Sequence, residues 1–438
     1  MTENESMRDS GVEWINETPN DWKIERLKNH VRFAYGDSLS SDNRNDGNIS
    51  VFGSNGIVGS HNQSITNGAT IIIGRKGSFG KITWSDKSCF PIDTTYFVDK
   101  TKTMQNLRWL YYVLYSLQLD TVNFDSAVPG LSRETAYSLY LPFPTISQQI
   151  DIADYLDQRC AKLDSIIAIK QQQIQALDVL QRNTISETVT RGFQACELKE
   201  TGNVWISEIP DHWKLVSLKR VCKIQTGFTL GKQYDEALIE RPYLRVANVQ
   251  DGHLNLSNVT TIEVPVDVAS RVELRAGDVL MTEGGDLDKL GRGTVWNAEI
   301  PNCLHQNHIF AVRCFQHKLL PAFLAYLTTS RYGRDYFEVT GKRTTNLAST
   351  NSTKVGQFPI PLPPKNEQKE ICDYLESKLS VIAKTSAGIE AQIATLEAYK
   401  KSLIYECVTG KKRIYSNDEK AAALTLGKLG KQVYTLSK

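Results

Sequence analysis

The sequence predicts an α+β protein: two globular domains with mainly antiparallel sheets, separated by a pair of long antiparallel coiled-coil helices with pseudo-twofold symmetry. The segment "GVEWINETPNDWKIERLK" at 11–28 returns at 202–219 as "GNVWISEIPDHWKLVSLK", with nine of eighteen positions identical. A second pair of related segments, "PFPTISQQIDIADYLD" and "PLPPKNEQKEICDYLE", starts at Pro142 and Pro361. A seven-residue apolar pattern follows each of these, so each half contains the same elements in the same order.

The segments at 11–28 and 202–219, here called the tryptophan segments, belong to regions 1–28 and 193–219. Their tryptophans could stack on nucleic-acid bases, but large aromatic side chains more often pack inside a protein. Because the second segment follows the first long helix directly, we expect the first to lie beside the end of the second helix. Trp14 and Trp22 should therefore contact residues 400–410, as Trp205 and Trp213 contact residues 181–191.

The variable regions at 29–140 and 220–358 are predicted to be globular domains. The stretches "GATIIIGRKGSFGKITW" (68–84) and "AGDVLMTEGGDLDKLGRGTVW" (276–296) each indicate a strand, a glycine-rich turn and another strand. We also expect short helices at 107–119 and 321–337. These patterns favour a twisted, mainly antiparallel sheet in each domain.

Residues 141–192 and 359–410 are predicted to form the two long helices, with Ser147 and Asn366 suited to capping their first turns. About forty residues without proline make a helix of roughly 60 Å. The connection from the first helix to the second domain is too short for a parallel return, which favours antiparallel packing. The predicted packing positions are Leu156, Leu163, Ile167, Ile174 and Leu177 in the first helix, and Leu375, Ile382, Ile389, Leu396 and Leu403 in the second.

The composition is that of a soluble cytoplasmic protein. The chain has 438 residues, 41% of them hydrophobic and 23% charged, and no apolar run long enough to span a membrane. The polar start "MTENESMRDS" is unlike a secretory signal, and the eight cysteines lack the spacing of a disulfide framework. The net charge of +2 permits nucleic-acid binding through local basic patches. The basic tail at 411–438 is compatible with a helix, a partner contact or a nonspecific DNA contact.

Two similar domains on a rigid spacer suit a ligand with regularly spaced features, such as duplex DNA. In the first domain, glycines in "GRKGSFGK" (74–81) would let the backbone approach a phosphate closely. The alternative is an ordinary hairpin turn with solvated charges. The candidate DNA-contacting residues of this domain are Ser54, Asn55, Arg75, Lys76, Ser78 and Lys81.

In the second domain, "GGDLDKLGRG" (284–293) occupies the place of the first glycine turn, and "TGKRTTN" (340–346) is the most basic loop. Arginine, lysine and asparagine can hydrogen-bond base edges, while Asp286 and Asp288 could accept from cytosine amino groups. Solvated surface charge is again the alternative. The candidate DNA-contacting residues here are Lys289, Arg292, Asn307, His308, Lys342, Arg343 and Asn346.

Metal and catalytic motifs are not apparent. The spacing of Cys303, His305, His308 and Cys314 is unlike that of a zinc finger, so no metal site and no catalytic residue are predicted. The sequence has no Walker A motif, no Asn-Pro-Pro-Tyr loop of an amino methyltransferase, and no nuclease motif after Pro210-Asp211. A stand-alone methyltransferase or nuclease is therefore less favoured than a DNA-binding protein. A structural adaptor with protein-binding end domains is the remaining alternative.

The duplicated tryptophan segments and "P-x-P…Q…I-x-DYL" helix starts around variable domains resemble the specificity subunits of type I restriction–modification systems, over about residues 11–411. This resemblance implies two target recognition domains that read a split, asymmetric double-stranded DNA sequence, with the helix pair setting the gap. It also implies a non-catalytic chain that binds no cofactor itself. Two methyltransferase (modification) subunits with S-adenosylmethionine, and restriction (translocase/endonuclease) subunits with ATP and magnesium, would be its partners.

Overall fold

The computed structural model describes residues 6–120, 130–285, 290–343 and 348–414. No helix within these ranges is long and apolar enough to cross a membrane. The chain divides into two units. Unit 1 comprises Met1–Lys170 with Ala391–Lys438, and unit 2 comprises Gln171–Glu390. The ends of the chain thus belong to one unit, and the middle forms the other.

Unit 1 contains a four-stranded antiparallel sheet in the order β4-β10-β7-β8. A three-stranded sheet, β6-β5-β9, lies beside it, and two two-stranded sheets, β1-β2 and β3-β11, hold the first tryptophan segment. The strands are β1 (Met7–Asp9), β2 (Glu17–Pro19), β3 (Lys23–Arg26), β4 (Ala34–Tyr35), β5 (Ile49–Gly53), β6 (Gly56–His61), β7 (Thr70–Gly74), β8 (Ile82–Ser85), β9 (Phe90–Pro91), β10 (Thr95–Asp99) and β11 (Tyr140–Phe143). The expected mainly antiparallel sheet is confirmed, and the parallel pair β5–β9 belongs to the separate three-stranded sheet.

Unit 2 repeats this plan, with a four-stranded antiparallel sheet in the order β15-β22-β18-β20. It also has the three-stranded sheet β17-β16-β21 and an additional small sheet, β19-β24-β23. The strands are β12 (Leu198–Glu200), β13 (Glu208–Pro210), β14 (Lys214–Ser217), β15 (Cys222–Thr226), β16 (Leu238–Leu244), β17 (Thr260–Pro265), β18 (Asp278–Thr282), β19 (Gly284–Gly285), β20 (Gly293–Val295), β21 (Leu304–His305), β22 (Ile309–Cys314), β23 (Lys342–Arg343), β24 (Ala348–Ser349) and β25 (Pro359–Leu362).

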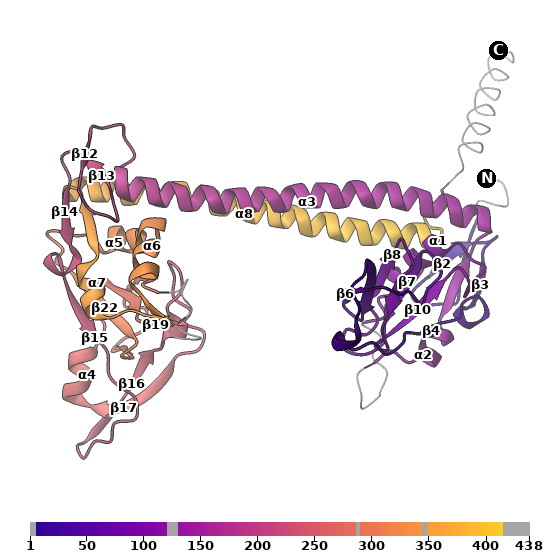
Figure 1. The fold of residues 1–438 in the computed structure, drawn as a ribbon, viewed down its shortest axis with the longest axis horizontal. Helices are drawn as coiled ribbons and strands as arrows, with labels where there is room; N and C mark the ends of the chain where they lie inside the picture. The colour runs from indigo at the N-terminus through magenta and orange to yellow at the C-terminus, as the bar shows by residue number, and fades with distance from the viewer. Residues whose placement is uncertain (1–5, 121–129, 286–289, 344–347, 415–438) are drawn as a thin grey trace, which may run out of the picture. The chain divides into compact units, whose positions relative to one another are not determined.

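Short helices pack on these sheets (Figure 1). They are α1 (Leu107–Ser116) and α2 (Arg133–Ser138) in unit 1, and α4 (Val266–Val272), α5 (Pro321–Thr329), α6 (Arg331–Thr340) and α7 (Ser352–Gln357) in unit 2. The expectation of one helix over 321–337 is wrong, because the helix breaks at Ser330. The Ser330 side chain accepts a hydrogen bond from the backbone nitrogen of Gly333 and thereby caps α6.

The two long helices are α3 (Ile146–Arg191) and α8 (Lys365–Val408), and each passes from one unit into the other. In unit 1 the start of α3 packs against the end of α8: Leu156 and Leu163 share a core with Leu403, and Lys400 binds Asp164 at 2.7 Å. In unit 2 the end of α3 shares a core with the start of α8 (Figure 1). The helices are therefore antiparallel in both units, as expected.

All ten predicted packing positions are at least partly buried. Leu156, Leu163, Ile167, Leu375, Ile382 and Leu403 are buried, and Ile174, Leu177, Ile389 and Leu396 are half-buried. A seam between only two helices leaves the sides of its apolar residues open to solvent, which accounts for the half-buried positions.

The helix starts differ from the expectation. Helix α3 begins before Ser147, and its first turn is capped by Thr145, whose hydroxyl accepts from the Gln148 backbone nitrogen at 3.3 Å. The Gln148 side chain in turn accepts from the Thr145 backbone nitrogen, which completes a reciprocal capping box. Helix α8 begins before Asn366 as well, directly after two prolines. Both predicted caps are therefore wrong, by about half a turn.

The first tryptophan segment lies beside the end of α8, as expected. Trp22 belongs to the same buried cluster as Leu403 and Cys407, and a Cβ on Gly410 would lie 3.2 Å from the Trp22 ring. The Thr18 hydroxyl donates to the carbonyl oxygen of Thr409 at 3.3 Å. In unit 2 Trp213 lies equivalently, 3.6 Å from a Cβ on Gly192. Both glycines have positive φ, and each ends a long helix.

The other two tryptophans are partly buried against the same cores, Trp14 on the core that includes Leu403 and Trp205 on the core that includes Val189. Trp14 Nε1 donates to the carbonyl oxygen of Tyr140 in β11 at 3.0 Å. The Trp205 ring makes an edge contact with Tyr336 in α6, with ring centres 5.1 Å apart. In each segment one tryptophan is therefore buried at the helix end, while the other is partly buried there and also contacts the adjacent globular domain.

Candidate nucleic-acid interface

The glycine turn at 74–81 connects β7 to β8 in unit 1. A Cβ on Gly74 would lie 2.2 Å from the carbonyl oxygen of Ser78, and one on Gly80 would lie 2.2 Å from the backbone nitrogen of Asp120. Gly77 and Gly80 also have φ values of 73° and 76°. Only glycine fits these positions without strain. The turn is thus compact, and it leaves Lys76 and Ser78 exposed.

The turn binds the neighbouring β5–β6 hairpin. The Ser54 hydroxyl donates to the carbonyl oxygens of Lys76 (2.5 Å) and Thr94 (2.9 Å). Lys81 Nζ donates to both oxygens of Asn55, at 2.7 and 3.0 Å. The structure therefore brings the predicted unit 1 residues together on one surface. Ser54 and Asn55 act there as supports for the turn.

Arg75 is held against aromatic rings. Its Nη1 donates to the carbonyl oxygen of Asp93 at 3.1 Å, and its guanidinium lies 5.0 Å from the Tyr35 ring centre and 5.8 Å from that of Tyr96. Burial raises the pKa of Tyr96, so this phenol stays neutral beside the cation. Such contacts favour this orientation of the guanidinium while leaving further N–H donors for a ligand.

Sequence reasoning missed Tyr35 and Arg133, which complete this surface. The Tyr35 side chain is 47% exposed, and the Arg133 guanidinium lies 5.2 Å from its ring centre. Tyr35 is on β4 and Arg133 at the start of α2, so no local motif joins them to Arg75. Exposed aromatic rings between cations are common in nucleic-acid-binding surfaces. A search for basic residues paired with exposed aromatics could have flagged them.

In unit 2 the polar residues gather at the end of β18. His308 Nδ1 lies 2.8 Å from Glu283 Oε2. The next residues, Gly284–Gly285, pair with β24, which pairs with β23, where Lys342 is exposed. Lys342 and His308 are therefore at the same end of the domain, in the β18 and β19 region.

The remaining predicted residues of unit 2 have varied outcomes. Asn307 is half-buried, with its backbone nitrogen bonded to the Phe228 carbonyl oxygen, and Arg292 is half-buried next to Gly291. A Cβ on Gly291 would lie 2.4 Å from the Phe337 ring, which fixes this turn against α6. Arg343 lies in β23, but the structure does not describe its side chain. Lys289 and Asn346, like Asp286 and Asp288, lie outside the described residues.

The four residues considered as zinc ligands do not converge on one site. Cys314 is opposite Cys222 across the β15–β22 pair, His305 Nδ1 donates to the Ile309 carbonyl oxygen, and His308 contacts Glu283. Burial raises the pKa of the Cys303 thiol to about 12 and lowers that of His305 to about 4. Within the described ranges, no three His, Cys, Asp or Glu side chains are grouped to hold a metal ion.

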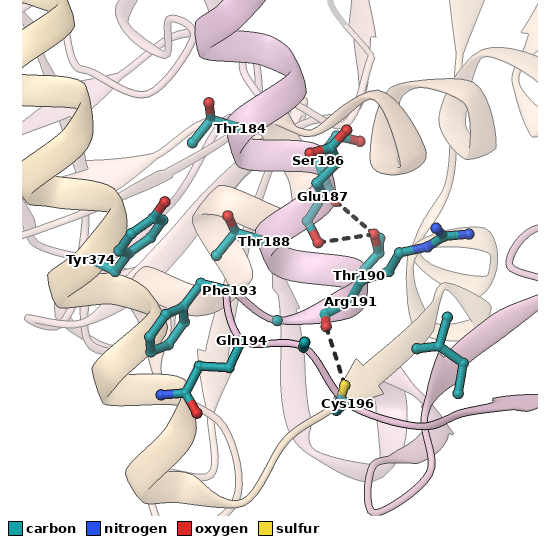
Figure 2. Close-up of a pocket in the computed structure, with 13 residues that line it drawn as sticks. Thr184, Ser186, Glu187, Thr188, Thr190, Arg191, Phe193, Gln194, Cys196 and Tyr374 are labelled. Carbon is teal, nitrogen blue, oxygen red and sulfur yellow. Dashed lines mark hydrogen bonds between the residues drawn. The ribbon is translucent and has the colours of Figure 1, made fainter.

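An open pocket of about 730 Å³ lies elsewhere in unit 2, at the end of α3. Figure 2 shows Phe193 stacked on Tyr374, with ring centres 4.9 Å apart, and the Thr190 hydroxyl bonded to the α3 backbone. The Cys196 thiol donates to the Arg191 carbonyl oxygen at 3.8 Å. The lining includes the hydroxyl side chains of Thr184, Ser186, Thr188 and Thr190 from the last turns of α3. The pocket has no contact with the candidate residues of β18 and β23.

Comparisons with known proteins agree with this architecture. The sequence matches the family described as "Type I restriction modification DNA specificity domain" twice, over residues 19–178 and 210–395. It is 24% identical over 428 residues to the type I restriction enzyme MjaVIII specificity subunit of Methanocaldococcus jannaschii, covering 90% of this chain and 94% of that one. The MjaX specificity subunit of the same organism is 26% identical over 206 residues, 47% of each chain.

A solved structure has a similar fold. It comes from work on complex assembly and conformational transition of the type I R-M system, and it aligns with a TM-score of 0.66 at 15% identity. The alignment covers 89% of this chain and 98% of that one.

Proposed function

Because the chain belongs to the type I restriction–modification DNA specificity family, we propose that each of its units recognises one half of a split, asymmetric DNA site. The observation that carries this proposal is the surface at the end of each central strand, β7 or β18. In unit 1 this surface combines Arg75, Lys76 and Tyr35 around a tight glycine turn. In unit 2 it combines Glu283, His308 and Lys342.

Under this proposal the α3–α8 pair sets the gap between the two half-sites. The same helices would bind two methyltransferase subunits, and restriction subunits would join that assembly in the cytoplasm. Methyl transfer with S-adenosylmethionine and cleavage with ATP and magnesium would take place on those partners. The chain itself would contribute recognition and no catalysis.

The proposal is tested by purifying the chain with its neighbouring modification subunits and mapping methylated bases across a genome. We expect methylation at a two-part sequence with a fixed gap. Methylation without such a sequence, or by the chain alone, would contradict the proposal. A complex that forms but neither binds nor methylates DNA would favour the structural adaptor instead.

Exchange of one domain separates the two units' roles. Replacing residues 220–358 with the corresponding domain of another family member should change one half of the sequence and leave the other half and the gap unchanged. A change in both halves would mean that the units do not recognise DNA independently.

A further inference from the structure

The four-stranded sheets of the two units have the same strand pairing, so their residues can be matched one to one. In unit 1, β7 ends where Gly74 pairs with Thr95, and the Arg75 backbone nitrogen then donates to the Thr94 carbonyl oxygen at 2.9 Å. In unit 2, β18 ends where Thr282 pairs with Ile309. The Glu283 backbone nitrogen donates to the His308 carbonyl oxygen, also at 2.9 Å. Arg75 and Glu283 thus occupy the same position in the two units.

A pair of glycines supports this equivalence independently. A Cβ on Gly36 would lie 2.1 Å from the Ile92 carbonyl oxygen, and one on Gly227 would lie 1.9 Å from the His305 carbonyl oxygen. After each glycine a parallel bridge follows, Asp37 with Ile92 and Phe228 with Gln306. The backbone around both positions is therefore built in the same way, and only the side chains differ.

The side chains at this position have opposite hydrogen-bonding character. The Arg75 guanidinium is oriented by Tyr35 and by the Asp93 carbonyl oxygen, which uses only part of its donor set. The Glu283 carboxylate is an acceptor oriented by His308 at 2.8 Å. A position that bound phosphate in both units would not carry a carboxylate in one of them, because the two anions repel. The position is better suited to contacting base edges.

On this basis, and resting on the proposed function, we propose that Arg75 and Glu283 are the equivalent specificity-determining residues of the two units. Arg75 selects a guanine, whose O6 and N7 accept two hydrogen bonds from a guanidinium in the major groove. Glu283 selects a cytosine, whose amino group donates to a carboxylate. The target is then asymmetric, because one backbone position presents donors in one unit and an acceptor in the other.

The test uses the full chain with its modification subunits and a pool of DNA duplexes with both half-sites randomised. Arg75→Gln should replace a guanine preference by adenine at one position of one half-site, and Glu283→Gln should replace cytosine by adenine in the other. Arg75→Ala should reduce discrimination at its position by about 5- to 150-fold. Arg32→Ala and Glu263→Gln, at exposed residues of the same two units, should leave both half-sites unchanged.

Arg75→Lys separates base contact from phosphate contact. Lysine keeps the charge but lacks the planar fork of a guanidinium, so guanine selection should weaken although the charge remains. The inference is overturned if Arg75→Lys behaves as wild type while Arg75→Ala weakens binding equally for all sequences. It is also overturned if either glutamine variant leaves both half-sites intact. If the wild-type complex itself selects no split sequence, the proposed function fails and this inference fails with it.

Discussion

At the residue scale, one carboxylate joins the second tryptophan segment to α8. Glu367 Oε1 accepts from Nε1 of the fully buried Trp213 at 2.9 Å, and Oε2 lies 2.8 Å from His212 Nε2. In unit 1 the corresponding residues are Gln148 and Trp22. There the glutamine side chain is used in the capping box of α3. The two halves therefore share a backbone plan but secure it with different hydrogen bonds.

Substitution of Glu367 should destabilise unit 2. Glu367→Ala leaves the Trp213 indole nitrogen buried without an acceptor, which costs about 1–3 kcal/mol. Glu367→Gln keeps an acceptor and should cost less. Hydrogen exchange of the unit 2 strands measures the change, with Glu370→Ala, an exposed residue of the same helix turn, as control. Equal effects of Glu367→Ala and Glu370→Ala would contradict the assigned role.

The buried His305 should make unit 2 acid-sensitive. Burial lowers its pKa to about 4, and among the described residues its Nε2 has no hydrogen-bond partner. Below the unfolded pKa of about 6.5 the unfolded chain takes up a proton that the folded unit does not. The contribution of neutral His305 to the free energy of unfolding is therefore fully present above about pH 6.5. It decreases as the pH falls towards 4, by about 3 kcal/mol in total.

Thermal unfolding of wild type and His305→Gln between pH 4 and 7.5 tests this expectation. The variant should have a lower melting temperature at neutral pH but a shallower decrease on acidification. Parallel decreases in the two proteins would show that other groups cause the acid sensitivity.

The candidate site shows what local sequence can and cannot indicate. The glycine turn containing Arg75 was predictable because glycine readily adopts the positive φ angles that tight turns require. Its ring partner Tyr35 was not, since the two residues are brought together only by the pairing of β4 with β10 and of β10 with β7. The equivalence of Arg75 with Glu283 also depends on strand register, and their side chains have nothing in common.

At the element scale, a repeated glutamine joins each long helix to its globular domain. The Gln149 amide accepts from the Asn106 backbone nitrogen at 2.9 Å and donates to Gln105 Oε1 and the Pro144 carbonyl oxygen. Gln368 accepts from the Leu320 backbone nitrogen at 2.8 Å and donates to two carbonyl oxygens. Both side chains are buried. The repeat of this residue in the sequence thus reflects a repeated structural joint.

Loss of either glutamine should loosen its joint. Gln149→Ala or Gln368→Ala leaves several buried polar groups unpaired, and we expect a loss of about 2–4 kcal/mol in the affected unit. Urea unfolding followed by hydrogen exchange would locate the effect at the start of α1 or α5. Gln171→Ala, at an exposed position of α3, is the matched control. If its effect equals that of Gln149→Ala, the amide contacts are not important for stability.

Long helices with a repeated heptad pattern were easier to predict than the residues at which they begin and end. The heptad pattern specified α3 and α8, because each core position recurs many times. The start of α3 was misassigned because Thr145 and Ser147 are both good caps, and the choice depends on the reciprocal bond from Gln148. The break at Ser330 was missed for the same reason, since a single serine ended one helix and capped the next.

At the scale of the whole molecule, the two units are formed by the chain in different ways. Unit 2 is a continuous stretch, whereas the core of unit 1 combines Trp22 with Cys407 and Val408. Tyr405 also donates to the Ile15 carbonyl oxygen at 3.3 Å, and Arg413 binds Asp21 at 2.9 Å. Unit 1 can therefore complete its core only after both long helices have been synthesised, while unit 2 needs only the middle of the chain.

The proposed role of the helix pair leads to a prediction about the gap in the DNA site. One heptad inserted into α3 after Lys170 and one into α8 before Ala391 preserves the apolar seam and lengthens each helix by about 10.5 Å. This length corresponds to about three base pairs. The gap in the selected sequence should widen by about that number, with both half-sequences unchanged. Four-residue insertions at the same points are the control, because they shift the heptad register and should impair selection without giving a new defined gap. If seven-residue insertions change the half-sequences, or leave the gap as it was, the helix pair does not set the spacing.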